Sequence, residues 1–192
     1  MRANKFIPAL SLLGLLIPAS QSQAVIIVMG GGAAKQCYAT AEYGDPYKAF
    51  DICSSALRDP SLSVRDRAAT YVNRSVVRLR VRDYNGAITD VDQSIVRNPK
   101  FGEAYVNRGA ALINLERHRE AVTELDKAID LGLDKLHLSY YNRGLAKERL
   151  NDVRGAYTDI KKAVELDPTF TLAVQELTRF VVGPGGSMGM RT

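Results

Sequence analysis

The 192-residue chain contains no Trp, only two His and only two Cys, and its charges nearly balance. Its 26 basic and 21 acidic residues leave a formal net charge of +5, and Arg2 and Lys5 lie ahead of the first acid, Glu42. So small an excess gives no electrostatic basis for nucleic-acid binding. His118 and His137 have no Cys or Ser partner in a nucleophile motif, and no metal-ligand spacing occurs. We therefore expect no enzyme activity, no catalytic residue, no metal, no cofactor and no nucleic-acid partner.

The first 24 residues have the pattern of a secretory signal peptide. Arg2 and Lys5 form a positive start, residues 6–18 are uncharged and mostly apolar, and small residues stand at positions 22 and 24. This apolar stretch is short of the roughly 20 residues that a membrane-spanning helix needs. The alternative is an uncleaved amphipathic start or anchor. We expect cleavage near Val25 and export to the periplasm or out of the cell as a secreted protein, with no membrane span once the signal is removed.

The chain repeats itself with spacings of 34 and 35 residues. Residues 71–75, 105–109 and 140–144 each read Tyr, Val or Tyr, Asn, Arg, and then Ser or Gly. After each motif, mostly apolar residues recur at i, i+1, i+4, i+7 and i+8, and a stretch beginning at Ala49 has the same pattern. This spacing places one apolar stripe along an α-helix. The repeat predicts helix–turn–helix units over residues 34–63, 64–101, 102–136 and 137–168.

These units resemble the tetratricopeptide repeat (TPR), a helix–turn–helix in which an aromatic residue, a Gly, an Ala, a large apolar residue and a Pro follow in fixed order. The places are filled by Tyr71, Tyr105 and Tyr140, by Ser75, Gly109 and Gly144, by Ala87, Ala121 and Ala156, by Val91, Leu125 and Ile160, and by Pro99 and Pro168. The chain departs from the pattern where Arg replaces the Leu before each small residue and where Leu133 replaces Pro. The resemblance implies an all-α, right-handed superhelical solenoid that binds a protein or peptide.

Segments on either side of the repeats are expected to complete the chain. Residues 169–182 carry apolar side chains at helical spacing, and we predict a C-terminal capping helix there because solenoids cover their end faces. Residues 183–192 contain much Gly and are expected to be a disordered tail. Residues 25–33, which include three consecutive Gly, are expected to be a flexible lead-in.

The two cysteines, Cys37 and Cys53, both fall in the first unit. In an exported chain an even number of Cys favours a disulfide. Alignment of Ala49 with Ala87 places Cys37 at the small-residue position of the first helix and Cys53 at the large apolar position of the second. Those positions face each other within a unit, so we expect a Cys37–Cys53 disulfide; two buried thiols are the alternative.

An Arg in the first helix of three units is followed, at the same spacing each time, by an acid in the second helix. The pairs are Arg74 and Asp90, Arg108 and Glu124, and Arg143 and Asp159. We favour ion pairs that join the two helices of a unit; the alternative is a row of Arg for an acidic ligand. The neighbouring carboxylates Asp90 and Asp92 are expected on a solvated helix face rather than as a catalytic pair.

An Asn occupies the third place of each motif, at Asn73, Asn107 and Asn142. On a helical wheel they lie away from the close-packing face, and in tetratricopeptide arrays that side of the first helices lines a concave groove. Their apolar neighbours on this side are Val72, Val76, Val106, Ala110, Tyr141 and Leu145. One hypothesis is a peptide-binding groove in which the Asn amides pair with an extended backbone. The alternative is that the Asn side chains make structural hydrogen bonds and the aliphatic residues pack between adjacent first helices.

Some tetratricopeptide proteins hold acidic chaperone tails with a clamp of Lys, Asn and Arg, and Asn107 or Asn73 could match its middle Asn. The Lys positions do not match: Val72 and Val76 stand there in the first unit of the clamp, and Leu138 and Asn142 in the third. Chaperone binding is therefore not carried over. The sequence predicts an interaction module, an adaptor of the cell envelope that holds an extended peptide or a partner's surface in its groove. A self-associating structural scaffold is the alternative. Whether the chain's own C-terminal helix or tail fills the groove is left open.

Overall fold

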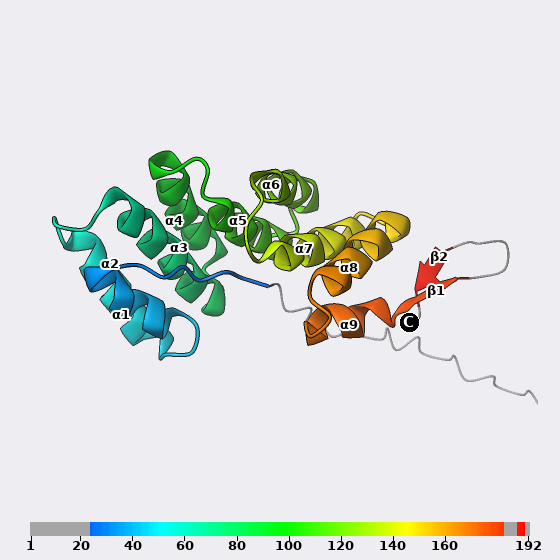
Figure 1. Cartoon of the computed structure of the whole chain (residues 1–192), viewed down its shortest axis with the longest axis horizontal. Coiled ribbons are helices and arrows are strands. Elements are labelled where there is room, and N and C mark those ends of the chain that lie inside the picture. The colour runs from blue at the N-terminus through cyan, green and yellow to red at the C-terminus, as the bar shows by residue number, and fades with distance from the viewer. Residues whose placement is uncertain (1–23, 183–187, 191–192) are drawn as a thin grey trace, which may run out of the picture.

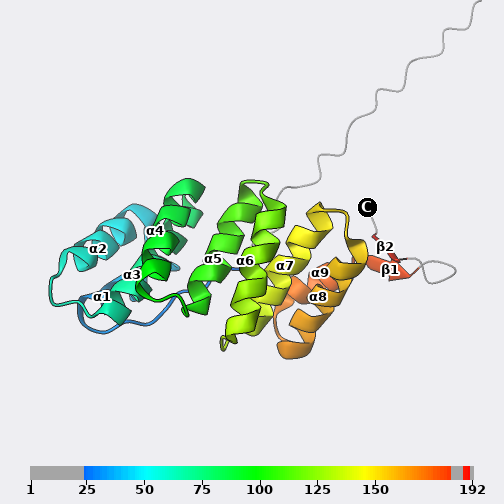
Figure 2. The same cartoon turned by 90° about the horizontal axis from the view of Figure 1, so that it is seen from above.

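The computed structural model of the chain describes residues 24–182 and 188–190. Except for Ala24, the expected signal peptide lies outside the described residues, as do residues 183–187 and 191–192 of the expected tail. The described part is almost wholly helical, and its helical hairpins stand side by side in chain order (Figure 1 and Figure 2). This confirms the all-α solenoid predicted from the sequence.

Each predicted unit is one hairpin of two helices. The hairpins are α1 (Gly32–Ala41) with α2 (Pro46–Arg58), α3 (Val64–Arg80) with α4 (Tyr84–Arg97), α5 (Gly102–Asn114) with α6 (His118–Leu131), and α7 (Leu136–Arg149) with α8 (Val153–Leu166). The second helix of one unit packs on the first helix of the next, and the first helices of successive units also meet: α1 with α3, α3 with α5, and α5 with α7. The first helices therefore form one continuous layer.

Short polar residues start several helices. The side chains of Asp45, Ser63, Asp83 and Asp152 each accept a hydrogen bond from the backbone N–H three residues later, which satisfies a free donor of the first turn. Pro46 occupies the first turn of α2, where its missing N–H has no cost. The three Asp caps mark where the second helices α2, α4 and α8 begin, and Ser63 marks the start of the first helix α3.

The turn inside three of the units uses the same backbone device. Arg82, Glu116 and Asn151 adopt left-handed conformations with φ of 61°, 59° and 63°. In each case the next N–H donates to the carbonyl five residues before it, at 2.9 Å. This bond ends the first helix as in a Schellman motif and turns the chain back for the second helix.

Small residues let the two helices of a unit approach closely. A Cβ added at Gly109 would lie 2.7 Å from Cγ of Leu125, and one at Gly144 would lie 2.6 Å from Cγ1 of Ile160. Both partners are fully buried. The space that a side chain would need at these two Gly positions is therefore filled by the branched side chain of the facing helix.

The first unit is joined by the Cys37–Cys53 disulfide, which confirms that prediction. The two Cα atoms are 4.6 Å apart, and both side chains have no exposed surface. Ala41, Ala49 and Val77 complete this small core. The covalent bond thus replaces the Gly–aliphatic contact that joins the helices of the third and fourth units.

The C-terminal segment differs from the single helix expected over 169–182. Helix α9 (Thr171–Leu177) packs on α8, and the chain then extends into β1 (Phe180–Val182), which pairs antiparallel with β2 (Met188–Met190). Phe180 is buried and packs edge-on against Tyr157, with ring centroids 5.6 Å apart. The extended segment places this aromatic ring on α8.

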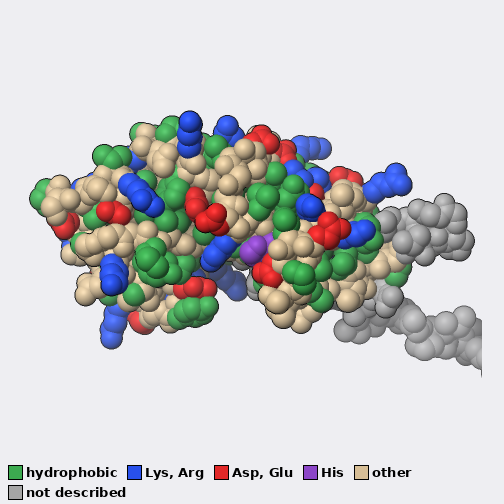
Figure 3. Space-filling model, viewed as in Figure 1, with side chains coloured by type: hydrophobic (Ala, Val, Ile, Leu, Met, Phe, Trp, Pro, Cys, Tyr) green, Lys and Arg blue, Asp and Glu red, His purple; other side chains and the backbone are tan. Residues whose placement is uncertain are grey.

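Within the described residues no helix is long and apolar enough to cross a membrane. Basic and acidic side chains are interspersed over the face seen in Figure 3, without a large area of one sign. Hydrophobic side chains on that face are scattered in small groups among them.

Candidate peptide groove

The three Asn of the repeat motif lie on successive first helices, Asn73 on α3, Asn107 on α5 and Asn142 on α7. All three side chains are fully buried. What covers them is the chain's own N-terminal strap, which we define as residues 24–28. Figure 1 shows this extended segment, in blue, crossing the first helices from the α1 end of the solenoid toward α7.

Each Asn forms two hydrogen bonds with one residue of the strap. Asn142 accepts from the N–H of Ala24 at 2.9 Å and donates to its carbonyl at 2.6 Å. Asn107 makes the same pair of bonds with Ile26, both at 2.8 Å. Asn73 pairs with Val28 at 2.6 and 2.7 Å. The amide side chains therefore satisfy the N–H and the C=O of alternate residues, as a neighbouring β-strand does.

This pairing fixes a register and a direction. The strap advances two residues for every unit, which suits an extended chain because alternate residues point the same way. It runs from the fourth unit toward the second, opposite to the order of the repeats. The groove therefore holds this extended chain in one register and one direction.

The apolar groove residues proposed from the sequence are all buried: Val72, Val76, Val106, Ala110, Tyr141 and Leu145. Ile26 of the strap is 3% exposed and belongs to the same apolar core as Val106, Tyr141 and Leu145. Val28 packs against this core and against the one that contains Val72. The nine proposed groove residues are thus all buried on the first helices, and the three Asn among them bond to the strap.

Tyr141 is among the most deeply buried side chains of this layer. Burial raises the pKa of its phenol above the ordinary value, and its ring packs edge-on against Phe170 at a centroid distance of 5.1 Å. The phenol group is therefore uncharged, and its ring forms part of the groove wall. Phe170 directly precedes α9, so the C-terminal segment packs against one wall of the groove. Among the described residues, the segment that lies inside the groove is the N-terminal strap.

The lead-in expected over residues 25–33 is therefore held rather than free of contacts. Besides the Asn pairs, Ile27 packs against the disulfide core of the first unit, and Gly31 donates its N–H to Asp66 at 2.9 Å. This bond and one from Ser63 lower the pKa of the Asp66 carboxyl. The signal in the sequence was the run of four β-branched residues at 25–28, which favours extended chain.

The recurrent Arg residues form the ion pairs favoured from the sequence. Arg74 binds Asp90 through two hydrogen bonds of 2.9 and 2.6 Å, and Arg143 binds Asp159 at 2.8 and 2.7 Å. Arg108 lies 3.6 Å from Glu124. These pairs join the two helices of the second, third and fourth units.

Each of these Arg side chains also reaches the second helix of the preceding unit. Arg74 contacts Ser54 at 3.1 Å, Arg108 contacts Asp92 at 3.3 Å and Arg143 contacts Asp126 at 2.6 Å. The Arg row therefore connects the units to one another.

The expectation that Asp90 lies on a solvated face is wrong. Its side chain is 1% exposed, because Arg74 and Arg78 both approach it from α3. Asp92, two positions further on, is 46% exposed and fits the expectation. Sequence periodicity within α4 did not separate the two carboxylates, since the side chains that bury Asp90 belong to the helix before it.

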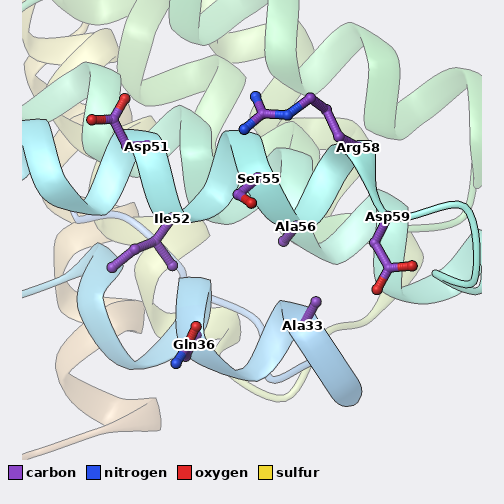
Figure 4. A pocket seen from close by; sticks show the side chains of 8 residues that line it. All are labelled: Ala33, Gln36, Asp51, Ile52, Ser55, Ala56, Arg58 and Asp59. Atoms are coloured by element: carbon purple, nitrogen blue, oxygen red, sulfur yellow. The ribbon is translucent and has the colours of Figure 1, made fainter.

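No group of three or more His, Cys, Asp or Glu in residues 24–182 and 188–190 is placed to hold a metal ion. Burial lowers the pKa of His118 and of His137. A hollow of about 500 Å³ between α1 and α2 is open to one side and lined by small and polar side chains, Ala33, Gln36, Asp51, Ile52, Ser55, Ala56, Arg58 and Asp59 (Figure 4).

The family comparison agrees with the repeat seen in the sequence. A tetratricopeptide repeat family model matches residues 102–131 and 138–170, the third and fourth units. The resemblance to this repeat family is thereby supported for these two units. No curated protein shows a significant match to the chain.

Solved structures with the same fold include a MamA from Desulfovibrio magneticus RS-1, which is 21% identical with a TM-score of 0.60 and for which the match covers 78% of this chain and 84% of that one. The Arabidopsis OM64 TPR domain is 23% identical with a TM-score of 0.57, over 61% of this chain and 96% of that domain. The first TPR of Spaghetti (RPAP3), bound to the HSP90 peptide SRMEEVD, is 22% identical with a TM-score of 0.56, over 59% and 90%. At these identities the likeness concerns the fold.

Proposed function

We propose that the chain is a tetratricopeptide-type interaction module without enzyme activity, whose groove holds an extended segment of a partner protein by its backbone. The observation that carries this is the row of three Asn side chains, each of which forms two hydrogen bonds with alternate residues of an extended chain. The strap demonstrates a backbone conformation that fits the groove. The apolar residues around the Asn row supply contacts for its side chains.

Solved relatives of the fold give this proposal a precedent. The first TPR of Spaghetti (RPAP3) is bound to an HSP90 peptide, and the second TPR domain of human RPAP3 is in complex with an HSP70 peptide. Both peptides end in acidic residues. In this chain the groove is apolar and its Asn amides contact backbone, so we propose an aliphatic rather than an acidic ligand.

We further propose that the protein works in the cell envelope, as an exported adaptor of the periplasm or the exterior. The signal-peptide pattern of residues 1–24 supports export. The buried disulfide suits an oxidising compartment, where such bonds form and persist. N-terminal sequencing of the protein from an envelope fraction tests this: a start near Val25 supports export, and an intact Met1 contradicts it.

Affinity capture from an envelope fraction tests the interaction itself. The bait is the exported chain, compared with a variant in which Asn73, Asn107 and Asn142 are all Leu. The matched control replaces the exposed Asn85 by Leu. Partners that the chain and the Asn85 control retain, and that the triple variant loses, support the groove.

Two results would contradict the proposal. Capture of the same partners by the triple variant moves binding away from the groove, and capture of nothing but further copies of the chain supports the self-associating scaffold instead. Circular dichroism of each bait shows that its helices are formed. Leu is chosen because it fills the Asn volume and leaves no buried amide without a partner.

A further inference from the structure

We propose that the N-terminal strap is an internal competitor for the groove, and that the partner is an extended aliphatic strand that replaces it in the same register and direction. This inference rests on the proposed function and adds the chemistry of the ligand and a gate on its binding. The strap is itself an extended chain bound in the groove, and its hydrogen bonds and apolar contacts indicate what a partner strand must offer.

The Asn row holds the strap in the groove by its backbone. The three amides have no exposed surface, and each spends its donor and its acceptor on the strap. A buried polar group without a partner is costly. Departure of the strap would uncover the three amides and the apolar side chains around them to water, and another extended backbone that takes the same bonds would bury both again. Exchange of one extended chain for another is therefore favoured over an empty groove.

The backbone bonds set one requirement on the partner and the side chains set another. Any residue except Pro offers the N–H and C=O that an Asn amide binds. Selectivity comes from the enclosed positions, where Ala24 is 8% exposed and Ile26 is 3% exposed. A charged side chain at the position of Ile26 would lose its hydration without gaining an ion pair. The partner strand therefore has a small residue, then an aliphatic residue two places on, and a further aliphatic residue at the position of Val28.

Tethering gives the strap its advantage over a free strand. Only residues 29–31 separate it from α1, and Gly31 is held by Asp66. A short tether raises the effective concentration of a bound segment to the millimolar range. A free peptide with the strap's own sequence must therefore bind the unaltered protein poorly. It binds well once the strap is weakened without a change to the groove.

The test uses Ile26→Lys in a chain that begins at Gln21 and so keeps the whole strap, because this change is designed to expel the strap and alters no groove residue. The matched control is Met29→Lys, which adds the same charge three positions away on a side chain that is 68% exposed. The probe is a fluorescent synthetic peptide with the sequence of residues 24–30, titrated with each protein and followed by anisotropy. We expect the probe to bind the Ile26→Lys protein at least tenfold more tightly than the unaltered protein or the Met29→Lys control. A second probe with Lys at the place of Ile26 is expected to bind none of them.

Equal affinities for all three proteins would overturn the proposal, as would failure of the probe to bind the Ile26→Lys protein while its circular dichroism is unchanged. Ile26→Ala provides a milder release if the Lys variant does not fold, and it is then expected to bind the probe more tightly than the unaltered protein and the Met29→Lys control do. The Asn triple variant separates the two proposals. If it loses captured partners while the strap variants leave probe binding unchanged, the groove function stands and the competitor role fails.

Discussion

The carboxylate of Asp90 in α4 accepts two hydrogen bonds from the guanidinium of Arg74 in α3, from Nε at 2.9 Å and from Nη2 at 2.6 Å. A third comes from Nε of Arg78 at 2.8 Å. Asp90 is almost completely enclosed, whereas the two Arg side chains keep 17% and 22% of their surface exposed. One buried charge thus holds together the hairpin that carries the first Asn of the groove.

Replacement of this carboxylate should destabilise the protein strongly. Asp90→Asn keeps the shape but leaves Arg74 without its carboxylate partner and removes one of the two carboxylates that Arg78 contacts, and we expect a loss of about 2–4 kcal/mol in the free energy of unfolding. The matched control is Asp92→Asn, which alters an exposed ion pair and should cost less than about 1 kcal/mol. Urea unfolding followed by circular dichroism measures both. Similar losses for the two variants would show that burial of Asp90 does not matter.

The repeat made most of this architecture predictable. Spacings of 34 and 35 residues located the hairpins, the position of Asn73, Asn107 and Asn142 within them, and the facing pair of cysteines. Such features depend on periodicity within one unit, which is visible in a single sequence. The ion pairs also followed from a spacing, because the acid stands at the same distance after the Arg in each of three units.

Periodicity could not predict that the N-terminal strap occupies the groove. The strap contacts its Asn partners across 45, 81 and 118 residues of chain. No periodicity links residues so far apart, and the glycines that follow the strap suggested freedom rather than attachment. The boundary of the C-terminal helix failed for a similar reason, because the burial of Phe180 on α8 is a tertiary contact that overrides local helical spacing.

A second prediction concerns the close contact between Gly109 and Leu125. Gly109→Ala forces a Cβ to within 2.7 Å of Leu125, and overpacking of this kind costs about 1–3 kcal/mol. Leu125→Ala alone should cost about 2–5 kcal/mol because it leaves a cavity. In the double variant the new methyl group enters that cavity, so the loss should be smaller than the sum of the single losses. A thermal-unfolding double-mutant cycle measures the coupling, and additive losses would contradict the contact.

A third prediction concerns the Cys37–Cys53 disulfide. Closure of the loop between Cys37 and Cys53, which are 16 residues apart, contributes roughly 3 kcal/mol in the chain-entropy model. Cys37→Ala with Cys53→Ala should lose about that amount. Hydrogen exchange should rise first in α1 and α2, because neither helix belongs to the core of the later units. Dithiothreitol should destabilise the unaltered protein and leave the double variant unchanged; an equal response of both would indicate that the bond is not formed in solution.

The last prediction concerns Ala24, whose N–H and C=O both bind Asn142. A chain that begins at Val25, as the expected cleavage produces, lacks this pair and leaves the buried Asn142 amide without it, at a cost of about 1–3 kcal/mol. Asn142→Leu should therefore stabilise the chain that begins at Val25 and destabilise a chain that begins at Gln21 and keeps Ala24. Urea unfolding of the four proteins measures the two effects. Effects of the same sign in both chains would show that Ala24 is not the partner of Asn142, whereas opposite signs mean that removal of the leader opens the α7 end of the groove.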